Sequence, residues 1–413
     1  MKKRVVVTGL GAVTPLGNNV NDFYDGIKEG KCGISPITLF DTEKFKVKIA
    51  GEVKDFNPEG VIGRKSTRRM DRFCQFAMVA AHEAVEDSKI DLDKIDKNRF
   101  GVVVGSGIGG LRTIEDQHTK LMEKGPSRIS PFLIPMIIGN MAAGNIAIEF
   151  GAKGVCTNIV TACASSTQCI GEAFKMIQDE RADVIIAGGT EAAITPLSIA
   201  GFTSMTALSN SNDPSRASIP FDKERSGFVM GEGAGIIILE SLEHASKRGA
   251  RIYSEMAGYG TSCDAYHMTA PSPDGDGPAR AMTEAIKDAG IEPSEVSYIN
   301  AHGTGTPYND RCETLAVKKA FGDAAYKIPM SSTKSMTGHL LGAAGGIEAV
   351  ACIKSMEDNF VPATIGYKEP DPECDLDCVP NKGREQELNY VMSNSLGFGG
   401  HNASIIFRSW RDR

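Results

Sequence analysis

The amino-acid sequence predicts an α/β fold of two similar halves that stack in five α-β-α-β-α layers. Apolar strand patterns alternate with helical patterns along the 413 residues, which is typical of a mostly parallel sheet covered on both faces. A faint internal repeat supports the duplication, because residues 83–90 (Glu-Ala-Val-Glu-Asp-Ser-Lys-Ile) resemble residues 284–291 (Glu-Ala-Ile-Lys-Asp-Ala-Gly-Ile). Each half reads as βαβαβαββ, with about five strands.

The two halves repeat the same order of elements. The paired segments are the strands 101–105 and 296–303, the turn and helix after Cys163 and 331–356, the strands 183–189 and 389–394, and the closing strands 234–239 and 403–407. We therefore expect a first half at residues 1–250 and a second half at residues 251–413, with the boundary in 245–255. Side chains drawn from both halves would meet between them.

The composition excludes several classes of protein. Hydrophobic residues make up 41% and charged residues 23% of the chain, as in a soluble globular protein, and the net charge of −7 argues against nucleic acid as a partner. The apolar start resembles a signal peptide, but Gly9, Gly11 and Pro15 interrupt it, so a first strand is expected. No apolar run reaches the ~18 residues of a membrane span.

The ten cysteines form no recognisable framework. The chain has no C-x-x-C motif, and the pair Cys374 and Cys378 lacks a nearby histidine or second pair, so we expect neither disulfides nor a metal site. Free thiols of this kind are typical of a reducing compartment, and we expect the protein in the cytoplasm.

Cys163 is the most informative residue of the sequence. It lies in Thr-Ala-Cys-Ala-Ser-Ser (161–166), between an apolar run, Val155 to Val160, that reads as a strand, and a helical pattern. One face of that helix carries Ile170, Ala173, Phe174 and Ile177. A thiol at a strand-to-helix turn lies at a helix N-terminus, which favours an anion. Most cysteines are small buried hydrophobic residues, so a reactive role requires partners elsewhere.

Two histidines are the candidate partners. His302 follows an apolar segment in Ile-Asn-Ala-His-Gly-Thr-Gly-Thr (299–306), and His339 ends Ser-Thr-Lys-Ser-Met-Thr-Gly-His (332–339) before a helix rich in glycine and alanine. A single histidine at such a place is more often structural. Three reactive side chains at three strand ends favour an active site, because sites in open α/β sheets are built at the carboxyl ends of strands.

These motifs together resemble the β-ketoacyl-acyl carrier protein synthases. The resemblance includes the Cys163 turn, Asn-Ala-His-Gly-Thr-Gly-Thr, Lys334 with Gly338-His339, and the tail Asn-Ser-Leu-Gly-Phe-Gly-Gly-His-Asn (394–402), and it extends from Arg4 to about Phe407. It is strongest for the elongating type II enzymes of bacterial fatty-acid synthesis. It implies a thiolase-like fold, a homodimer, and an acyl carrier protein as partner. No cofactor of its own is expected, since phosphopantetheine arrives on the carrier.

The resemblance implies a decarboxylative condensation in which Cys163 holds the acyl chain. His302 and His339 would stabilise the enolate formed when malonyl carrier loses CO₂, as oxyanion donors do. The backbone N–H groups of Cys163 and Phe398 would stabilise the second oxyanion, and Gly399 beside Phe398 allows close approach. Phe398 is expected to be a gate that moves when Cys163 is acylated. A helix N-terminus contributes at best about 2 kcal/mol toward a thiolate, so the imidazoles are expected to help.

Further residues take their expected roles from the resemblance. Lys334 orients the site and pairs with Glu348, and some relatives place a monovalent cation near such a glutamate and an asparagine like Asn300. Thr304 and Thr306 match hydroxyls that bind the phosphopantetheine arm, although such threonines also satisfy their own turn. The positions expected to line the acyl pocket are Ile108 and Phe202.

Several rival functions remain open at this point. The segment Gly105-Ser-Gly-Ile-Gly-Gly110 satisfies G-x-G-x-x-G, but no strand with an acidic end follows about 20 residues later, so a dehydrogenase is disfavoured. Priming enzymes of the superfamily resemble Cys-His-Asn and thiolases use a second cysteine, whereas this chain has histidine at both later positions. A polyketide-type ketosynthase and a non-catalytic carrier-binding subunit also remain compatible with the sequence.

A basic cluster interrupts the acidic sequence. It comprises Arg64, Lys65, Arg68, Arg69 and Arg72. One interpretation is an ordinary solvated helix start. The other, which we adopt, is that Arg64, Lys65, Arg68 and Arg69 dock the acidic carrier protein.

Overall fold

The computed structural model describes residues 2–411, and its centre is one sheet of ten strands in the order β10-β9-β13-β14-β8-β1-β7-β6-β4-β5. The strands are β1 (Val5–Val13), β4 (Phe100–Gly105), β5 (Cys156–Thr157), β6 (Val184–Glu191), β7 (Gly233–Ser241), β8 (Ser254–Cys263), β9 (Val296–Asn300), β10 (Met330–Ser331), β13 (Tyr390–Gly397) and β14 (His401–Ser409). Two small ribbons lie outside it, β2 (Ser35–Pro36) with β3 (Ile49–Ala50) and β11 (Phe360–Val361) with β12 (Arg384–Glu385).

The sheet contains the same five-stranded unit twice. When the strands of each half are numbered along the chain, both halves have the order 3-2-4-5-1, namely β5-β4-β6-β7-β1 and β10-β9-β13-β14-β8. The two units join where β1 pairs with β8, Val5–Val7 against Ser254–Met256. The duplication predicted from the repeat is therefore confirmed.

Strand directions refine the prediction of a mostly parallel sheet. In each half one strand, β7 or β14, runs antiparallel to both of its neighbours, while β4 pairs in parallel with β5 and β6, as β9 does with β10 and β13. Four of the five strands in each half thus share a direction, but the sheet as a whole is mixed.

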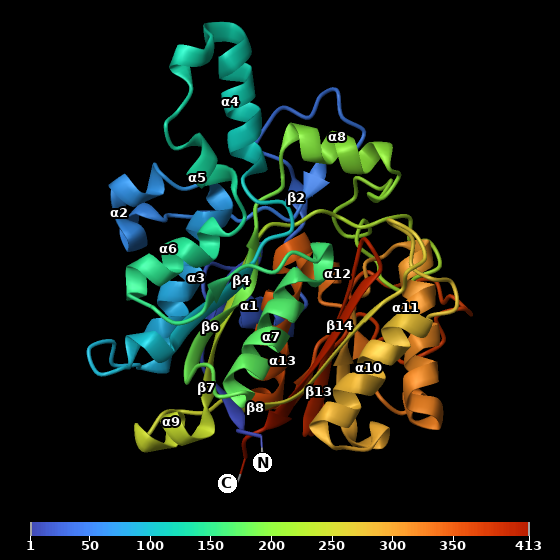
Figure 1. Cartoon of the computed structure of the whole chain (residues 1–413). Helices are drawn as coiled ribbons and strands as arrows, with labels where there is room; N and C mark the ends of the chain where they lie inside the picture. Colours follow the sequence, from blue (N-terminus) through green and yellow to red (C-terminus); the bar gives the residue numbers. More distant parts are fainter. Residues whose placement is uncertain (1, 412–413) are drawn as a thin grey trace.

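Helices complete the five predicted layers (Figure 1). Two helices, α7 (Ser165–Gln178) and α13 (Ala344–Asp358), lie between the two halves of the sheet. The outer face of the first half is covered by α3 (Arg72–Ser88) and α6 (Met141–Phe150), and that of the second half by α10 (Asp276–Ala289) and α11 (Pro307–Phe321). The remaining α-helices are α1 (Val20–Glu29), α2 (Glu59–Thr67), α4 (Leu111–Lys124), α5 (Leu133–Ile137), α8 (Pro196–Ser204), α9 (Leu242–Lys247) and α12 (Lys334–Thr337).

The alternation of side chains along the strands explains why helices cover both faces. On β7, Ile236 and Ile238 pack into the outer core under α3, whereas Ile237 and Leu239 pack into the central core around α7 and α13. Successive side chains of a strand point to opposite faces, so a strand that is apolar at every position requires cover on both sides.

The two central helices begin in the same way. Each follows a short 3₁₀ turn, η3 (Ala162–Ala164) before α7 and η6 (Leu341–Ala343) before α13. The first residues of these turns, Ala162 and Leu341, have left-handed φ values of 50° and 49°, which is uncommon for residues with a side chain. The middle residues, Cys163 and Gly342, therefore occupy equivalent positions in the two halves.

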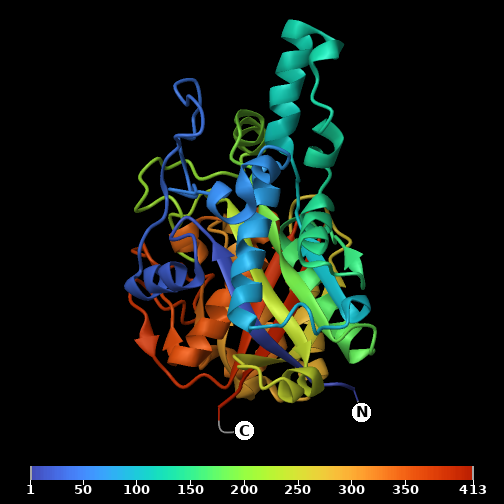
Figure 2. The same ribbon diagram turned by 90° about the vertical axis from the view of Figure 1, so that its left-hand side faces the viewer.

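The edge of the first half differs from the prediction. Only Cys156 and Thr157 of the run expected to be a strand, Val155 to Val160, pair with β4, because the chain leaves the sheet edge to reach the turn at Cys163. Beyond the glycine loop, α4 stands out from the body of the molecule (Figures 1 and 2). In residues 2–411, we find no helix with the length and apolar character that a membrane crossing needs.

Candidate active site

The structure brings Cys163, His302 and His339 into one cavity of about 480 Å³. Cys163 lies in the turn before α7, His302 follows β9, and His339 lies between α12 and η6. All three are buried, with exposed fractions of 8%, 2% and 2%. The first half thus contributes the sulfur and the second half both imidazoles, as the duplicated fold predicts.

The two imidazoles lie against each other and are neutral. Their ring centroids are 5.2 Å apart and their planes meet at 84°. Burial, followed by the positive charge of Lys334, holds the pKa of both histidines well below its usual range. His339 Nδ1 accepts a hydrogen bond from the backbone N–H of Leu341 at 3.3 Å, so the proton of the neutral ring is assigned to Nε2.

The thiol of Cys163 is also neutral in the free protein. Its pKa is raised to about 12, chiefly by burial; Lys334 and the backbone N–H groups of Phe398 and Cys163 act to lower it, and the charge of Glu191 acts to raise it. From the sequence, a helix terminus and the imidazoles were expected to favour the thiolate. Here desolvation outweighs them, because α7 begins only at Ser165 and neither ring carries a charge.

Lys334 forms the expected ion pair with Glu348. Their exposed fractions are 1% each, and burial raises the pKa of Glu348 while Lys334 lowers it. Removing one partner of such a pair would leave an uncompensated buried charge. Because Glu348 stabilises its charge, Lys334 can remain positively charged beside the imidazoles without contact with solvent.

Asn300 lies under the site with unsatisfied polar atoms. Its amide oxygen and nitrogen, Oε2 of Glu348 and Oγ of Ser393 have no hydrogen-bond partner among the described residues, and Ser393 is the register partner of Asn300 on β13. Buried oxygens of this kind suit a hard cation, so these residues fit the monovalent ion that the resemblance implies. Within residues 2–411 no group of three or more His, Cys, Asp and Glu side chains is arranged to hold a metal.

The residues expected to bind the substrate line the same cavity, with one exception. Ile108, Phe202, Thr304 and Thr306 are all part of its wall. The Oγ1 atoms of Thr304 and Thr306 are 2.9 Å apart, and that of Thr306 also caps α11 by accepting from Asn309 N–H. In the free protein both threonines therefore satisfy their own turn, and a ligand would have to compete with these bonds.

The loop after β13 approaches the thiol closely. Phe398 lines the cavity, and its ring lies 6.4 Å from that of Phe202. A Cβ atom on Gly397 would lie 2.5 Å from the carbonyl oxygen of Thr161 and 3.3 Å from the backbone nitrogen of Cys163, so glycine permits this approach. Gly399 does not line the cavity: its N–H donates to the carbonyl of Met268 at 2.8 Å, and its φ of 88° favours glycine.

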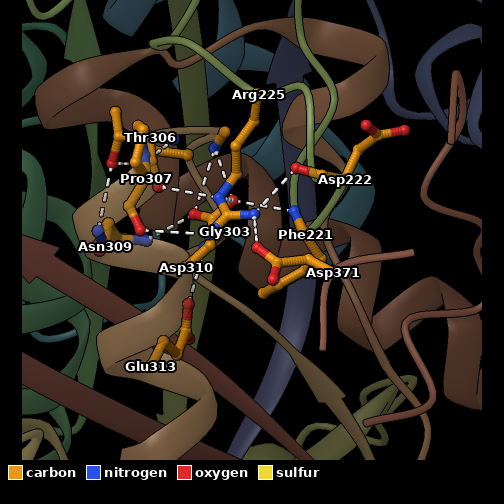
Figure 3. Close-up of polar contacts among 12 residues, drawn as sticks. Phe221, Asp222, Arg225, Gly303, Thr306, Pro307, Asn309, Asp310, Glu313 and Asp371 are labelled. Atoms are coloured by element: carbon orange, nitrogen blue, oxygen red, sulfur yellow. Dashed lines mark hydrogen bonds and ion pairs between the residues drawn. The ribbon is translucent and has the colours of Figure 1, made fainter. Parts of the chain in front are cut away.

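Sequence reasoning missed the carboxylates that hold the loop after β9 (Figure 3). Glu313 on α11 accepts from the backbone N–H groups of His302 and Gly303, both at 2.8 Å. Asp310 accepts from Gly305 and Phe221 and lies 3.6 Å from Arg225. Their spacing of three places both on one face of α11, and that buried face continues with the apolar residues Ala316, Val317 and Phe321, which was the signal available in the sequence.

The basic cluster divides into two parts. Arg64, Lys65, Arg68 and Arg69 are exposed around a surface hollow that also contains Phe132, with Arg69 stacked 4.9 Å from the Phe132 ring. Arg72 instead turns inward and pairs with the buried Glu232 at 2.7 Å. The four exposed cations therefore remain available to a partner, and Arg72 does not.

Comparison with known proteins agrees with this site. Residues 2–245 match the beta-ketoacyl synthase N-terminal domain, and residues 253–368 match the C-terminal domain. The chain is 56% identical to a 3-oxoacyl-acyl-carrier-protein synthase 2 of Synechocystis and 55% identical to one of Staphylococcus aureus, with 99% of each protein covered in both cases.

Solved structures show the same fold. A beta-ketoacyl synthase of Burkholderia phymatum is 35% identical, with a TM-score of 0.91. A ketosynthase of a type II polyketide synthase, solved in complex with its acyl-carrier protein, is 40% identical, with a TM-score of 0.93. Both comparisons cover 99% of this chain and 100% of the other. The predicted thiolase-like ketosynthase fold is confirmed, and the chain belongs to the beta-ketoacyl synthase family.

Proposed function

We propose that the protein is a β-ketoacyl-acyl carrier protein synthase of the type II class, which condenses an acyl group held on Cys163 with malonyl carrier to elongate a fatty acid. The observation that carries the proposal is the meeting of a thiol from the first half with two neutral imidazoles from the second in one cavity. The similarity to two synthases of this class over nearly the whole chain supports it.

In the first step the sulfur of Cys163 attacks the acyl thioester. A bond forms between Sγ and the acyl carbon, the bond to the phosphopantetheine sulfur breaks, and the thiol proton ends on that leaving sulfur. Because the pKa of Cys163 is raised, the proton must leave during the attack rather than before it. A neutral imidazole of the cavity is able to accept it and pass it on.

In the second step the malonyl group loses CO₂. Two neutral imidazoles donate N–H groups to the thioester oxygen as negative charge develops there, and a preorganised donor of this type is worth about 10²–10³ in rate. The carbanion then attacks the acyl carbon on Cys163. The backbone N–H groups of Phe398 and Cys163 already point toward that sulfur, so they are placed for the oxyanion of this second attack.

The acyl carrier protein is the partner that this reaction requires. We assign its docking to Arg64, Lys65, Arg68 and Arg69, which form an exposed basic surface on a chain of net charge −7. The complex of a polyketide ketosynthase with its acyl-carrier protein supports a carrier as partner. The hydroxyls of Thr304 and Thr306 would bind the phosphopantetheine arm, and the enzyme would need no cofactor of its own.

We also propose a cytoplasmic homodimer. The edge strand β5 and its neighbouring helices leave Cys156, Ile134, Ile138 and Ile148 exposed, and an open strand edge is a template for pairing with another chain. All ten cysteines are free thiols, which suits a reducing compartment. Light scattering tests the dimer, and cell fractionation tests the location.

A polyketide ketosynthase is the second candidate, favoured by the structural likeness to such enzymes. The two differ in product: fatty-acid elongation adds one two-carbon unit per carrier cycle, whereas a polyketide enzyme extends an unreduced β-ketoacyl chain repeatedly. A non-catalytic subunit would bind the carrier but form no product.

The test is intact mass of the purified protein after mixing with acyl carrier thioester, followed by addition of malonyl carrier. We expect one acyl mass on the wild type, release of a β-ketoacyl carrier, and neither on Cys163→Ala. An acyl mass retained by Cys163→Ala, or a wild type that takes up no acyl group, would contradict the proposal.

A further inference from the structure

The glycine loop Gly105–Gly110 contributes Ile108 to the wall of the acyl pocket, and its backbone is built around an anion. Such a loop cradles a pyrophosphate in dinucleotide-binding proteins, with backbone N–H groups directed at the charge. Here the N–H groups of Gly107 and Ile108 donate to the carboxylate of Glu191 at 2.9 and 3.2 Å, and Ser106 Oγ donates at 2.9 Å. The charge that the loop encloses therefore comes from the protein itself.

The same carboxylate reaches the second half of the chain. Gly342 donates its N–H to Glu191 Oε2 at 3.1 Å, and the Gly342 carbonyl accepts from the hydroxyl of Ser166. The peptide of Gly342 is thus held on both sides by residues of the first half. A Cβ atom on Gly342 would collide with the backbone nitrogen of Gly107 and lie 2.7 Å from Glu191 Oε2, so the two loops are in direct contact.

Gly342, which makes this contact, lies only three residues after the catalytic His339. The turn from His339 to Gly342 contains Leu341, whose N–H donates to His339 Nδ1 and so assigns the ring proton to Nε2. Leu341 adopts a left-handed φ of 49°, a conformation that persists only when its surroundings impose it. The bonds from Glu191 and Ser166 to the next residue supply such surroundings.

On its other side, the contact involves the loop Ser106–Ile108, which forms part of the acyl pocket. Ile108 lines the cavity and is one of the residues expected to contact the acyl chain. Its backbone N–H is held by Glu191, and Gly109 N–H is held by Ser106 Oγ at 3.0 Å. The carboxylate is itself fully buried and has four donors, which offset only part of its desolvation, since burial still raises the pKa of Glu191 to about 7.

We propose that Glu191 is a positioning residue of the condensation step, which clamps the acyl-pocket loop Ser106–Ile108 against the turn His339–Gly342 and thereby keeps the Nε2–H of His339 aimed at the reacting thioester. The inference rests on the proposed function, because it assigns His339 the role of a donor to malonyl thioester. Glu191 borders the cavity but is fully buried, and its oxygens are bonded to the two loops, so it acts through them.

The test separates the two half-reactions. Cys163 of Glu191→Gln is first loaded with a hexanoyl group, confirmed by intact mass, and malonyl carrier is then added in a single turnover. A glutamine keeps the volume but replaces one acceptor oxygen with an NH₂ group, so two of the four donors lose their acceptor and the clamp is weakened. We expect the maximal condensation rate to fall about tenfold to a hundredfold, the cost of a small misplacement of a catalytic group, while half-saturation for malonyl carrier changes less than about twofold.

Glu83→Gln is the matched control. Glu83 also accepts two backbone N–H groups, from Ala12 and Val20 at 2.9 and 2.7 Å, but it lies on α3 outside the cavity. It should condense at the wild-type rate. If Glu191→Gln does not fold, Ser106→Ala replaces it. That variant removes one of the three loop-side bonds to Glu191 and leaves the bond from Gly342 in place, and it is expected to slow loading of long acyl groups more than loading of hexanoyl.

The outcomes are distinct. A Glu191→Gln protein that condenses like wild type, or a Glu83→Gln protein that is slowed equally, overturns the positioning role. So does a Ser106→Ala protein with an unchanged preference for acyl length. A wild type that neither loads hexanoyl nor releases CO₂ overturns the proposed function instead.

Discussion

The turn at Cys163 and the turn at Gly342 have the same conformation and occupy equivalent positions in the two halves of the molecule, but their roles differ. Each is a 3₁₀ turn with a left-handed first residue before a central helix. Strand β13 ends beside the first turn with Gly397, and β6 ends beside the second with Glu191. Gly397 lets its strand approach the backbone of the Cys163 turn, whereas the Glu191 carboxylate and the Gly107 backbone contact the Gly342 turn.

The difference shows that the duplicated fold supplies positions and the side chains decide the chemistry. The first turn places a thiol against an open cavity. The second turn has no side chain at the equivalent position, and it serves to hold the imidazole of His339 three residues before it. Four predictions test this division of labour.

The largest effect is expected from the imidazoles. His302→Ala and His339→Ala should each lower the rate of condensation by about 10²–10³, because each removes one donor to the enolate. Both should still load an acyl group on Cys163, at a reduced rate. Single-turnover assays on the preloaded enzymes measure this, and equal loss in loading and condensation would contradict separate roles for the two halves.

A side chain at Gly342 in the second turn should destabilise the protein. Gly342→Ala is expected to destabilise the protein by about 1–3 kcal/mol, since its Cβ has no free space. Gly201→Ala on α8 is the control, because a Cβ there meets nothing within 4 Å, and alanine should stabilise that helix by up to about 1 kcal/mol. Urea unfolding compares the two. Equal stabilities would show that the space beside Gly342 is not filled.

The pKa of Cys163 predicts how alkylation depends on pH. Only the thiolate reacts, so the alkylation rate of a free cysteine stops rising with pH above its pKa of about 8.5. Because the pKa of Cys163 is raised to about 12, its alkylation by iodoacetamide should rise about tenfold per pH unit from pH about 7 to 10 without levelling off. Peptide mass spectrometry follows the site. A plateau near pH 7 would mean that the resting enzyme already holds a thiolate.

The smallest effect concerns carrier docking, which we assign to the first half alone. Arg68→Glu with Arg69→Glu should raise the KM for acyl carrier about fivefold and leave small thioester mimics unchanged, with a smaller difference at high salt. Lys287→Glu is the control, because Lys287 is an exposed lysine on α10, the second-half counterpart of α3. A similar loss with the mimic would exclude docking at this surface.

The sequence was informative where chemistry is tied to strand ends. Cys163 and His302 each follow an apolar segment, His339 follows a predicted strand end, and the rule for open sheets is enough to place them together. Periodicity also predicted the five layers, because strands apolar at every position need cover on both faces. The ion pair of Lys334 with Glu348 was predictable because a lone charge in an apolar helix requires a partner.

Other features depend on distances that a sequence does not contain. Glu191 and Glu313 look like ordinary charged residues, and their partners are backbone N–H groups of other segments. The neutral state of Cys163 follows from burial, which only the packed structure reveals. The expected strand at 155–160 is short because the chain must leave the sheet to reach Cys163. Gly399 supports the loop rather than the cavity.

The seam where β1 meets β8 is only three residue pairs long, while the apolar sides of α7 and α13 touch both parts of the protein. A polypeptide truncated near residue 250 would expose the apolar surface of α7 to water. Large exposed apolar surfaces drive self-association. The truncated chain would also carry the sulfur without the imidazoles. Translation must therefore finish before any catalysis begins, and a premature stop codon beyond the first half would yield an aggregate instead of a slow enzyme.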